Sequence, residues 1–229
     1  PLQVARQGLI GLAFCNAGHL GRQIAPYGGL DGKPSTNPIS FAAPRLAAEP
    51  ILVDMTTSVC AEGKVRVAHN KGEMLPEGRI IDHDGNPSVD PEDFVGNPPG
   101  AILPFGGPVA YKGYCLSMVV EILGGALGGQ GTANGETVMQ SNGLHLTVYN
   151  IGHFVEEDDF HTELESLIKH VHTSRVDPRI GEILLPGEPE YRTGRRRQKE
   201  GIPIDETTWA RIGEAARGLG LDPDSWPQG

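Results

Sequence analysis

Short apolar runs along the chain predict four β-strands. Residues 9–15 and 39–43 have the composition of strands, and residues 51–54 form a mostly apolar run short enough for a buried strand. Residues 145–151 alternate between apolar and polar positions. Alternation places successive side chains on opposite faces of a sheet, so we expect a sheet built from these segments.

Four stripes of apolar residues at spacings of three and four predict helices. The first helix is expected after Ser58 and ends near Gly72, where glycine is typical of a helix C-terminus. The second begins at the Y-K-G-Y stretch, residues 111–114, and breaks up into a glycine-rich run. The stripes are Ala61, Val65 and Ala68; Leu116, Val119, Val120 and Leu123; Phe160, Leu164, Leu167, Ile168 and Val171; and Trp209, Ile212, Ala216 and Leu219.

Interleaved strands and helices indicate an α/β or α+β fold. The sequence has no β-α-β rhythm of about 30 residues and no internal repeat, so a doubly wound parallel sheet is not expected. Residues 83–87, H-D-G-N-P, predict a turn. Residues 96–108 are rich in proline and glycine and predict an irregular loop.

The composition limits the classes of partner. The 229-residue length allows one large domain or two small ones, and a chain of this size buries about 70% of its unfolded surface. A hydrophobic content of 38% and a charged content of 21% are typical of a folded globular protein. The net charge of −10 repels polyanions, so nucleic-acid binding is not expected. A small molecule is the expected partner.

The cysteines and the most apolar segment argue against a secreted or membrane protein. Cys15, Cys60 and Cys115 are odd in number and have apolar neighbours, which predicts reduced, buried thiols in the cytoplasm. Residues 116–127, L-S-M-V-V-E-I-L-G-G-A-L, are too few for a membrane span and include Glu121, so they predict a buried helix. No membrane anchor and no signal peptide are expected, and the chain is expected to begin in mid-fold.

The stretch V-D-M-T-T-S-V-C-A-E-G-K-V, residues 53–65, runs from a strand into a helix and carries three hydroxyl groups. A helix N-terminus has amide groups without intrahelical partners and a partial positive charge, which together favour an anion site. Thr57 or Ser58 could equally cap the helix. The residues alone leave both interpretations open.

Two basic features could contact a phosphate. Lys112 lies at the start of a predicted helix, after the loop at 96–108, where its charge adds to the helix dipole. The run G-R-R-R-Q-K-E-G, residues 194–201, is basic in an acidic chain, but such runs usually form a solvated face. A surface position also remains open for Lys112.

Other cofactor and catalytic motifs are missing from the sequence. Neither G-x-G-x-x-G nor G-x-x-x-x-G-K-[ST] occurs, and there is no G-x-S-x-G. His170 and His172 are two residues apart on a predicted helix and point in different directions, while His153 and His161 are eight apart. We therefore expect no metal site.

Seven stretches, in order, resemble the malate/L-lactate dehydrogenase family that is unrelated to the Rossmann-type enzymes. This family includes ureidoglycolate, sulfolactate and diketogulonate oxidoreductases and a cyclic-imine reductase. The stretches are G-L-I-G-L-A at 8–13, A-P-Y-G-G at 25–29, S-T-N-P-I-S-F-A-A-P at 35–44, residues 53–65, E-G-R-I-I-D-H-D-G-N-P-S-V-D-P at 77–91, G-G-P-V-A-Y-K-G-Y-C-L at 106–116 and L-L-P-G-E-P-E at 184–190. Ordered motifs across nearly the whole chain make this resemblance specific.

The resemblance implies a homodimeric oxidoreductase that transfers a hydride between NAD or NADP and a small 2-hydroxy or 2-keto acid. It implies a non-Rossmann nicotinamide-binding fold, α/β (α+β), with a mixed, largely antiparallel sheet and flanking helices. It also favours the hydroxyls and amides of residues 53–65 facing the cofactor. The implied contacts are Asp54, Met55, Thr56, Lys112, Gly113, Gly187, Glu188 and Pro189 with the cofactor, and Thr36 and Glu62 with the substrate.

Two features depart from the family pattern. The acid/base histidine and an H-x-G motif belong to an N-terminal portion that is absent from these residues, so the catalytic residue is unknown. His19 imitates that motif but follows the first strand, and the role is not carried over to it. Glu62 stands near the substrate where the family often has a basic residue, which leaves the substrate charge open.

Residues 1–150 are expected to form the cofactor-binding domain. Residues 151–229 are expected to complete it with a strand and helix region that packs on the N-terminal portion. The alternative is a non-catalytic binding or dimerisation module that keeps the fold and lacks the acid/base. An upstream H-x-G motif would favour the enzyme.

Overall fold

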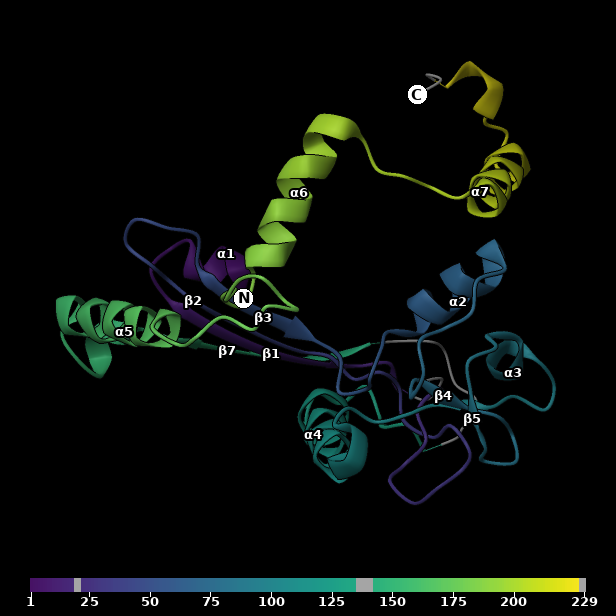
Figure 1. Ribbon diagram of the computed structural model, residues 1–229, viewed down its shortest axis with the longest axis horizontal. Coiled ribbons are helices and arrows are strands. Elements are labelled where there is room, and N and C mark those ends of the chain that lie inside the picture. The colour runs from purple at the N-terminus through teal and green to yellow at the C-terminus, as the bar shows by residue number, and fades with distance from the viewer. Residues whose placement is uncertain (19–21, 135–141, 227–229) are drawn as a thin grey trace.

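The computed structural model describes residues 1–18, 22–134 and 142–226, and it contains two sheet regions (Figure 1). The larger sheet has the strand order β3-β2-β1-β7, and every neighbouring pair is antiparallel. The smaller sheet has the order β5-β4-β6, also antiparallel. Antiparallel sheets with flanking helices confirm the predicted fold class.

The strands of the larger sheet follow the apolar runs closely. They are β1 (Ile10–Asn16), β2 (Ile39–Ala43), β3 (Ile51–Met55) and β7 (Gly143–Tyr149). Only β7 differs by two residues at each end from its prediction. It ends before Asn150, whose side chain accepts a hydrogen bond from the Gly152 amide at 3.1 Å and so starts a short 3₁₀ turn instead.

Helices α1, α5 and α6 lie beside the larger sheet (Figure 1). Helix α1 (Leu2–Ala5) lies so close to β1 that a Cβ on Gly11 would be 2.8 Å from the Cα of Pro1. Helix α5 (Glu157–His172) is joined to the sheet by a bidentate pair, in which the Arg45 guanidinium donates to Glu165 at 2.8 and 2.9 Å. Helix α6 (Glu188–Glu200) begins beside β3 and then projects away from the sheet (Figure 1).

The smaller sheet consists of β4 (Ile80–Ile81), β5 (Pro87–Ser88) and β6 (Ala101–Ile102), with α2 (Glu62–Lys71) and α3 (Glu92–Val95) beside it. Strand β6 falls within the stretch that was expected to be irregular, and both of its residues are buried. The core of this region joins residues from all of these segments except β5. Its buried members are Ile24, Cys60, Val65, Ala68, Leu75, Ile80, Phe94 and Ile102.

Helix α2 confirms most of its prediction. Val65 and Ala68 are buried, and the helix ends at Gly72, whose φ of 67° is the left-handed conformation that glycine favours. Its N-cap, however, is Ala61, and no side chain caps it. Of the two interpretations left open for this segment, capping of the helix by Thr57 or Ser58 is therefore wrong.

The helix predicted at residues 116–127 is present, but it buries a different face from the predicted apolar stripe. Helix α4 (Tyr111–Val120) continues into a π-helical segment, Glu121–Ala126, and Val120 alone of the predicted stripe is buried. The inward face carries small and polar residues because it meets polar side chains of β1 and of the turn before β2. The apolar residues exposed on the outward face are Met118, Val119 and Ile122.

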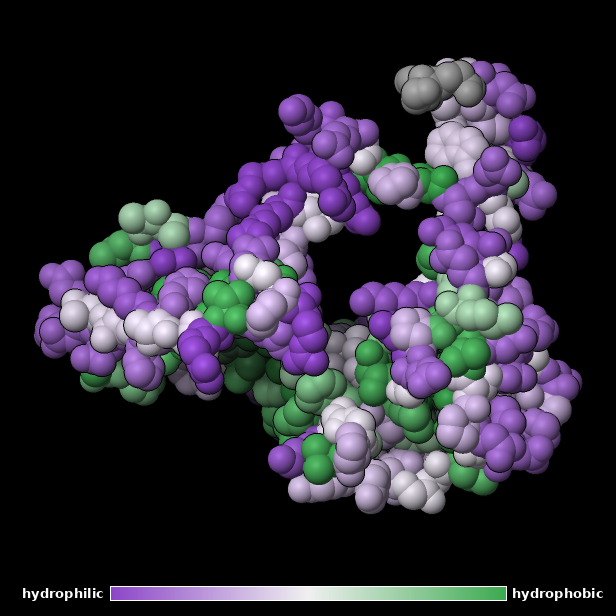
Figure 2. Space-filling model, viewed as in Figure 1, coloured by the Kyte–Doolittle hydropathy of each residue, from purple (hydrophilic) through white to green (hydrophobic). Residues whose placement is uncertain are grey.

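The two C-terminal stripes are only partly covered. In α5, Ile168 is buried whereas Leu167 and Val171 are exposed. In α7 (Glu206–Gly218), Ala216 is buried whereas Trp209 is exposed. Figure 2 shows apolar surface at the sheet region and on the connection between α6 and α7. Helical periodicity thus located the helices but not what covers them.

The cysteines divide by position. All three are free thiols, and Cys60 is buried, which raises the pKa of its thiol. Cys15 is half-buried, and Cys115 is exposed on the outward side of α4. The prediction of a buried thiol is wrong for Cys115.

The basic run forms the second half of α6, a helix that the sequence pattern did not predict. Its residues from Gly194 onward are exposed, as expected of a solvated face. Among the described residues, no helix combines the length and the apolar character needed to cross a membrane.

Candidate functional site

The end of β3 and the Leu-Pro-Gly turn, residues 185–187, are held together by backbone contacts. Strand β3 is at the edge of the larger sheet, and its Leu52 amide donates to the carbonyl of Pro186 at 3.1 Å. Gly187 has φ 96°, and a Cβ there would lie 2.8 Å from the Cβ of Leu52. Only glycine permits both this conformation and this approach. Segments that are far apart in sequence therefore form one surface.

A groove of about 500 Å³ lies between these two segments. Four predicted cofactor residues line it: Asp54 and Met55 at the end of β3, and Gly187 and Pro189 in the turn. Its other lining residues are Leu52, Val53, Leu184, Leu185, Pro186 and Glu190. The wall is mainly apolar, with the exposed carboxylate of Asp54 at one end of the strand. The structure thus brings together two motifs that are far apart in the sequence.

The Glu188 side chain supports the turn from inside. Its carboxylate accepts a hydrogen bond from the Leu185 amide at 3.1 Å, and the residue lines a smaller cavity of about 240 Å³ rather than the groove. On the same side, the Tyr191 hydroxyl donates to the carbonyl of Pro50 at 3.0 Å, and burial raises the pKa of this phenol. The structure shows Glu188 holding the turn in place.

The strand-to-helix segment does not present free hydroxyls. The Thr57 amide and hydroxyl both donate to the carbonyl of Thr36, at 3.0 and 3.2 Å. The Ser58 hydroxyl donates to the carbonyl of Cys60 at 2.7 Å, and that of Thr56 donates to the Ser58 carbonyl at 3.0 Å. Thr57 and Ser58 are buried. The expectation that their hydroxyls face a dinucleotide is therefore wrong, because internal carbonyls occupy them.

The start of α4 packs directly against this segment. A Cβ on Gly113 would be 2.3 Å from the carbonyl oxygen of Phe105 and 2.8 Å from that of Thr57. Gly113 is therefore needed for a close backbone approach, and its neighbour Lys112 is exposed in the first turn of the helix. Lys112 does not line the groove, but this packing joins its helix to the residues that follow β3.

The two predicted substrate residues lie in different settings. Thr36 is half-buried, and its carbonyl takes both hydrogen bonds from Thr57, so the turn before β2 is tied to the residues after β3. The Glu62 carboxylate forms an ion pair with Arg66 one helical turn later in α2. Arg66, a cation of the same chain, therefore pairs with Glu62, the residue that departs from the family pattern.

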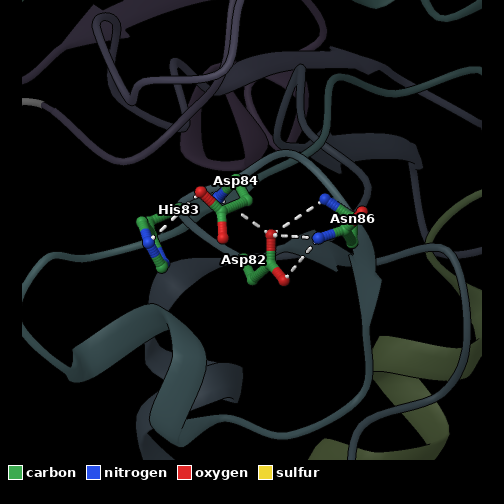
Figure 3. A network of polar contacts seen from close by, with 4 residues as sticks. All are labelled: Asp82, His83, Asp84 and Asn86. Atoms are coloured by element: carbon green, nitrogen blue, oxygen red, sulfur yellow. Dashed lines mark hydrogen bonds and ion pairs between the residues drawn. The ribbon is translucent and has the colours of Figure 1, made fainter.

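The H-D-G-N-P stretch forms the expected turn, between β4 and β5 (Figure 3). The Asp82 carboxylate accepts from the amides of Asp84 and Asn86 at 3.0 and 2.8 Å. Hydrogen bonds from the Asn86 side chain and backbone lower the pKa of Asp82. His83 contacts Asp84 at 3.3 Å, so the polar groups of this motif are used within the turn.

No described histidine lines the groove. His69 contacts Glu92 at 2.9 Å and His145 contacts Thr147 at 3.0 Å, both in other parts of the molecule. His19 lies outside the described residues. Within those residues there is also no group of three or more histidine, cysteine or acidic side chains that could hold a metal ion.

The groove has the chemistry to hold part of a nicotinamide dinucleotide. Its apolar wall suits a planar ring, and an exposed carboxylate such as that of Asp54 accepts hydrogen bonds from ribose hydroxyls or an amide. The leucines that build this wall, Leu52 and Leu184, were not predicted as site residues. Their signal was present in the sequence, because each lies two or three residues from a predicted contact.

Comparisons with known proteins agree with the motifs. The family model described as malate/L-lactate dehydrogenase matches residues 1–213. Hydroxycarboxylate dehydrogenase B of Escherichia coli is 36% identical over 227 residues, which cover 97% of this chain. L-lactate dehydrogenase of Cupriavidus necator is 34% identical over 221 residues, which cover 95% of it.

The fold comparison gives the same match. A solved Escherichia coli structure described as a malate/lactate dehydrogenase is 36% identical and superposes with a TM-score of 0.87. That match covers 97% of this chain and 62% of the other. The chain likewise spans 62% of the length of each of the two curated relatives.

Proposed function

The chain belongs to the malate/L-lactate dehydrogenase family, and from this premise we propose that it forms the nicotinamide-binding part of an NAD- or NADP-dependent 2-hydroxyacid oxidoreductase. The observation that carries the proposal is the groove in which the end of β3 meets the Leu-Pro-Gly turn. Two motifs of the family resemblance, distant in sequence, converge there. The substrate is a small 2-hydroxy or 2-keto acid.

Each segment has a distinct role in this proposal. A bound nicotinamide supplies the hydride acceptor or donor for the carbon that carries the hydroxyl or keto group. Leu52 and Met55 provide the apolar wall that keeps water from the ring, and Asp54 accepts hydrogen bonds from the cofactor. Lys112 provides a positive charge at the start of α4 for a phosphate. Thr36 lies beside the substrate, on the turn tied to Thr57.

Lys112→Ala tests the cofactor role. Loss of one charge-assisted contact weakens binding by about 1.5–3 kcal/mol, or roughly ten- to a hundredfold in Kd. Fluorescence titration of the 229-residue protein with NADH and, separately, NADPH measures this. Lys169→Ala removes another exposed lysine, on α5, and is expected to leave Kd unchanged. Equal affinity of wild type and Lys112→Ala would remove Lys112 from the site, and no binding by wild type would reject the proposal for this chain.

The alternative function is a non-catalytic binding or dimerisation module. It is favoured by one observation, that no described histidine lines the groove. We expect the 229 residues to bind cofactor but to reduce pyruvate or oxaloacetate slowly, because loss of a general acid costs about 10²–10⁴-fold. NADH oxidation at tens per second by the chain alone would contradict this and place the acid within these residues.

We also propose a homodimer in the cytoplasm. Support for the dimer comes from β7, at the edge of the larger sheet, which exposes Leu144, Leu146 and Val148 on one face. Support for a reducing compartment comes from the free thiols. Sedimentation velocity at micromolar concentration is expected to show a dimer that Leu146→Asp dissociates and Leu46→Asp, in an exposed loop, does not. A monomeric wild type would contradict the dimer.

A further inference from the structure

A buried polar cluster connects β1, the turn before β2 and helix α4. Its members are Asn16, Asn37, Ser117 and Glu121, none more than 6% exposed. Asn37 Nδ2 donates to Glu121 Oε1 at 2.8 Å and to Ser117 Oγ at 2.9 Å. Asn16 Nδ2 donates to Glu121 Oε2 at 3.0 Å. These bonds link residues 80 or more positions apart in sequence.

The Glu121 carboxylate is the centre of this cluster. Besides the two asparagines, it accepts from the Ala133 amide at 3.0 Å, so three N–H groups surround it. None of the ion pairs in the described residues includes Glu121. A buried carboxylate depends on such hydrogen bonds, and an apolar side chain in its place would leave these three N–H groups without an acceptor. The glutamate therefore organises the cluster around it.

Asn37 adds a second costly feature. Its φ of 43° is left-handed, a conformation in which asparagine is tolerated better than most residues. Both Nδ2 hydrogens are used by Glu121 and Ser117, while the buried Oδ1 has no hydrogen-bond partner. The amide is therefore oriented by what Nδ2 donates to. Glu121 fixes that orientation because only an acceptor can face Nδ2.

The cluster joins the segments of the proposed site. Asn37 follows Thr36, whose carbonyl holds Thr57. Ser117 and Glu121 continue the helix that presents Lys112, and Gly113 of that helix packs on the Thr57 carbonyl. Three segments therefore contact one another in turn: the turn before β2 contacts the residues after β3, these contact α4, and α4 contacts the turn.

We propose that Glu121, acting through Asn37, is a positioning residue that fixes Thr36 relative to Lys112 and the end of β3. The ligand roles of Thr36 and Lys112 rest on the proposed function, whereas the mechanical link does not. Glu121→Gln keeps the shape but turns one acceptor into a donor facing a neighbouring donor. It therefore breaks one half of the cluster.

Two measurements on the 229-residue protein test the link. Hydrogen exchange at the Thr57 amide reports whether the Thr36 turn is released, and it needs no cofactor. NADH titration reports the effect on the site. Glu121→Gln is expected to speed Thr57 exchange at least about tenfold. It is also expected to weaken NADH binding by about tenfold, less than the roughly hundredfold loss from a 1 Å misplacement.

The variants at Asn37 separate side-chain positioning from backbone strain. Glycine adopts a φ of 43° without strain, so Asn37→Gly removes the hydrogen bonds and leaves the backbone unstrained. Asn37→Ala removes the hydrogen bonds and also strains the backbone. Both are expected to behave like Glu121→Gln. Wild-type exchange and affinity in Asn37→Gly would overturn the proposal, because the backbone alone would then position the turn.

Two further comparisons exclude a general loss of stability. Asp205→Ala removes the N-cap of α7, far from the cluster, and is expected to lower Tm while leaving Thr57 exchange and Kd unchanged. Lys112→Ala is expected to cost less affinity in the Glu121→Gln background than in wild type, and additive losses would overturn the coupling.

If wild type does not bind NADH, the proposed function fails, while Thr57 exchange still decides the link. If Glu121→Gln does not fold, Asn37→Gly and Ser117→Ala give the same readouts.

Discussion

The two sheet regions bury their apolar residues to different extents. In the smaller region Val65, Ile80 and Ile102 are fully buried in one core. In the larger sheet the large apolar residues of β7 stay exposed, with Leu144 at 61% and Leu146 at 50%. A two-residue strand is thus better covered than a seven-residue strand. The difference indicates that the core of the smaller region is closed by residues that the structure describes, whereas the larger sheet has a face suited to another surface.

Paired alanine substitutions should give the largest effect and expose this difference directly. Ile80→Ala leaves a cavity in a closed core and is expected to lower the free energy of unfolding by about 2–5 kcal/mol. Leu146→Ala removes a half-exposed side chain, and in the monomer it is expected to cost less than about 1 kcal/mol. Urea denaturation at a concentration where the protein is monomeric measures both. Equal losses would contradict the comparison.

An added methyl group at Gly113 tests the close packing of α4 on the residues that follow β3. The Cβ of Gly113→Ala would overlap backbone atoms of Phe105 and Thr57, so we expect destabilisation of about 1–3 kcal/mol. Gly63→Ala in α2 is the matched control, since its Cβ meets nothing within 4 Å. Gly63 lies in the first turn of α2, and replacing a glycine whose conformation alanine can adopt stabilises by about 0.4–1 kcal/mol. Thermal unfolding should therefore shift in opposite directions, and a shift in the same direction would argue against close packing at Gly113.

The smallest effect is expected at the ion pair that fastens α5 to the larger sheet. The hydrogen bond from Arg45 lowers the pKa of Glu165, so the stabilisation is present above the carboxyl's unfolded pKa of about 4.3 and is lost as pH falls through the folded value. The pKa of Arg45 is raised by its hydrogen bond with Glu165, so the Arg45 side chain does not titrate in this range. Because Glu165 is 38% exposed, the pair contributes at most about 1 kcal/mol.

Comparison of wild type with Glu165→Gln isolates this pair from other carboxylates that titrate in acid. Wild type is expected to be more stable at pH 7, and the difference should disappear at a pH below the folded pKa of Glu165. The denaturation midpoint in urea at several pH values gives the result. A difference that persists at the lowest pH would show that packing of the side chain, rather than its charge, fastens α5.

Sequence pattern predicted the elements well where local and tertiary preferences agree. The bounds of β2 and the end of α2 at Gly72 were predicted correctly, because an apolar run and a left-handed glycine are local features. Strand β6 and helix α6 were missed. Strand β6 is formed only by pairing with β4, and the charged sequence of α6 has no apolar stripe to detect.

The candidate site was predicted in pieces. The residues that line the groove, Asp54, Met55, Gly187 and Pro189, were named from the resemblance, but nothing local brings them together. Their proximity follows from the Leu52–Pro186 hydrogen bond at the edge of the sheet. For Thr57 and Ser58 the local pattern was misleading, because the acceptors of their hydroxyls come partly from a turn 21 residues earlier.

The sequence by itself determined the family, the positions of most strands and helices, and the segments that build the site. It could do so because periodicity, glycine positions and ordered motifs are written in neighbouring residues. Only the tertiary structure decided which face of α4 is buried, since that depends on the polar side chains of Asn16 and Asn37 that the helix meets. A helical stripe records that a helix is amphipathic, and the surface that it packs on determines whether its apolar or its polar side is inside.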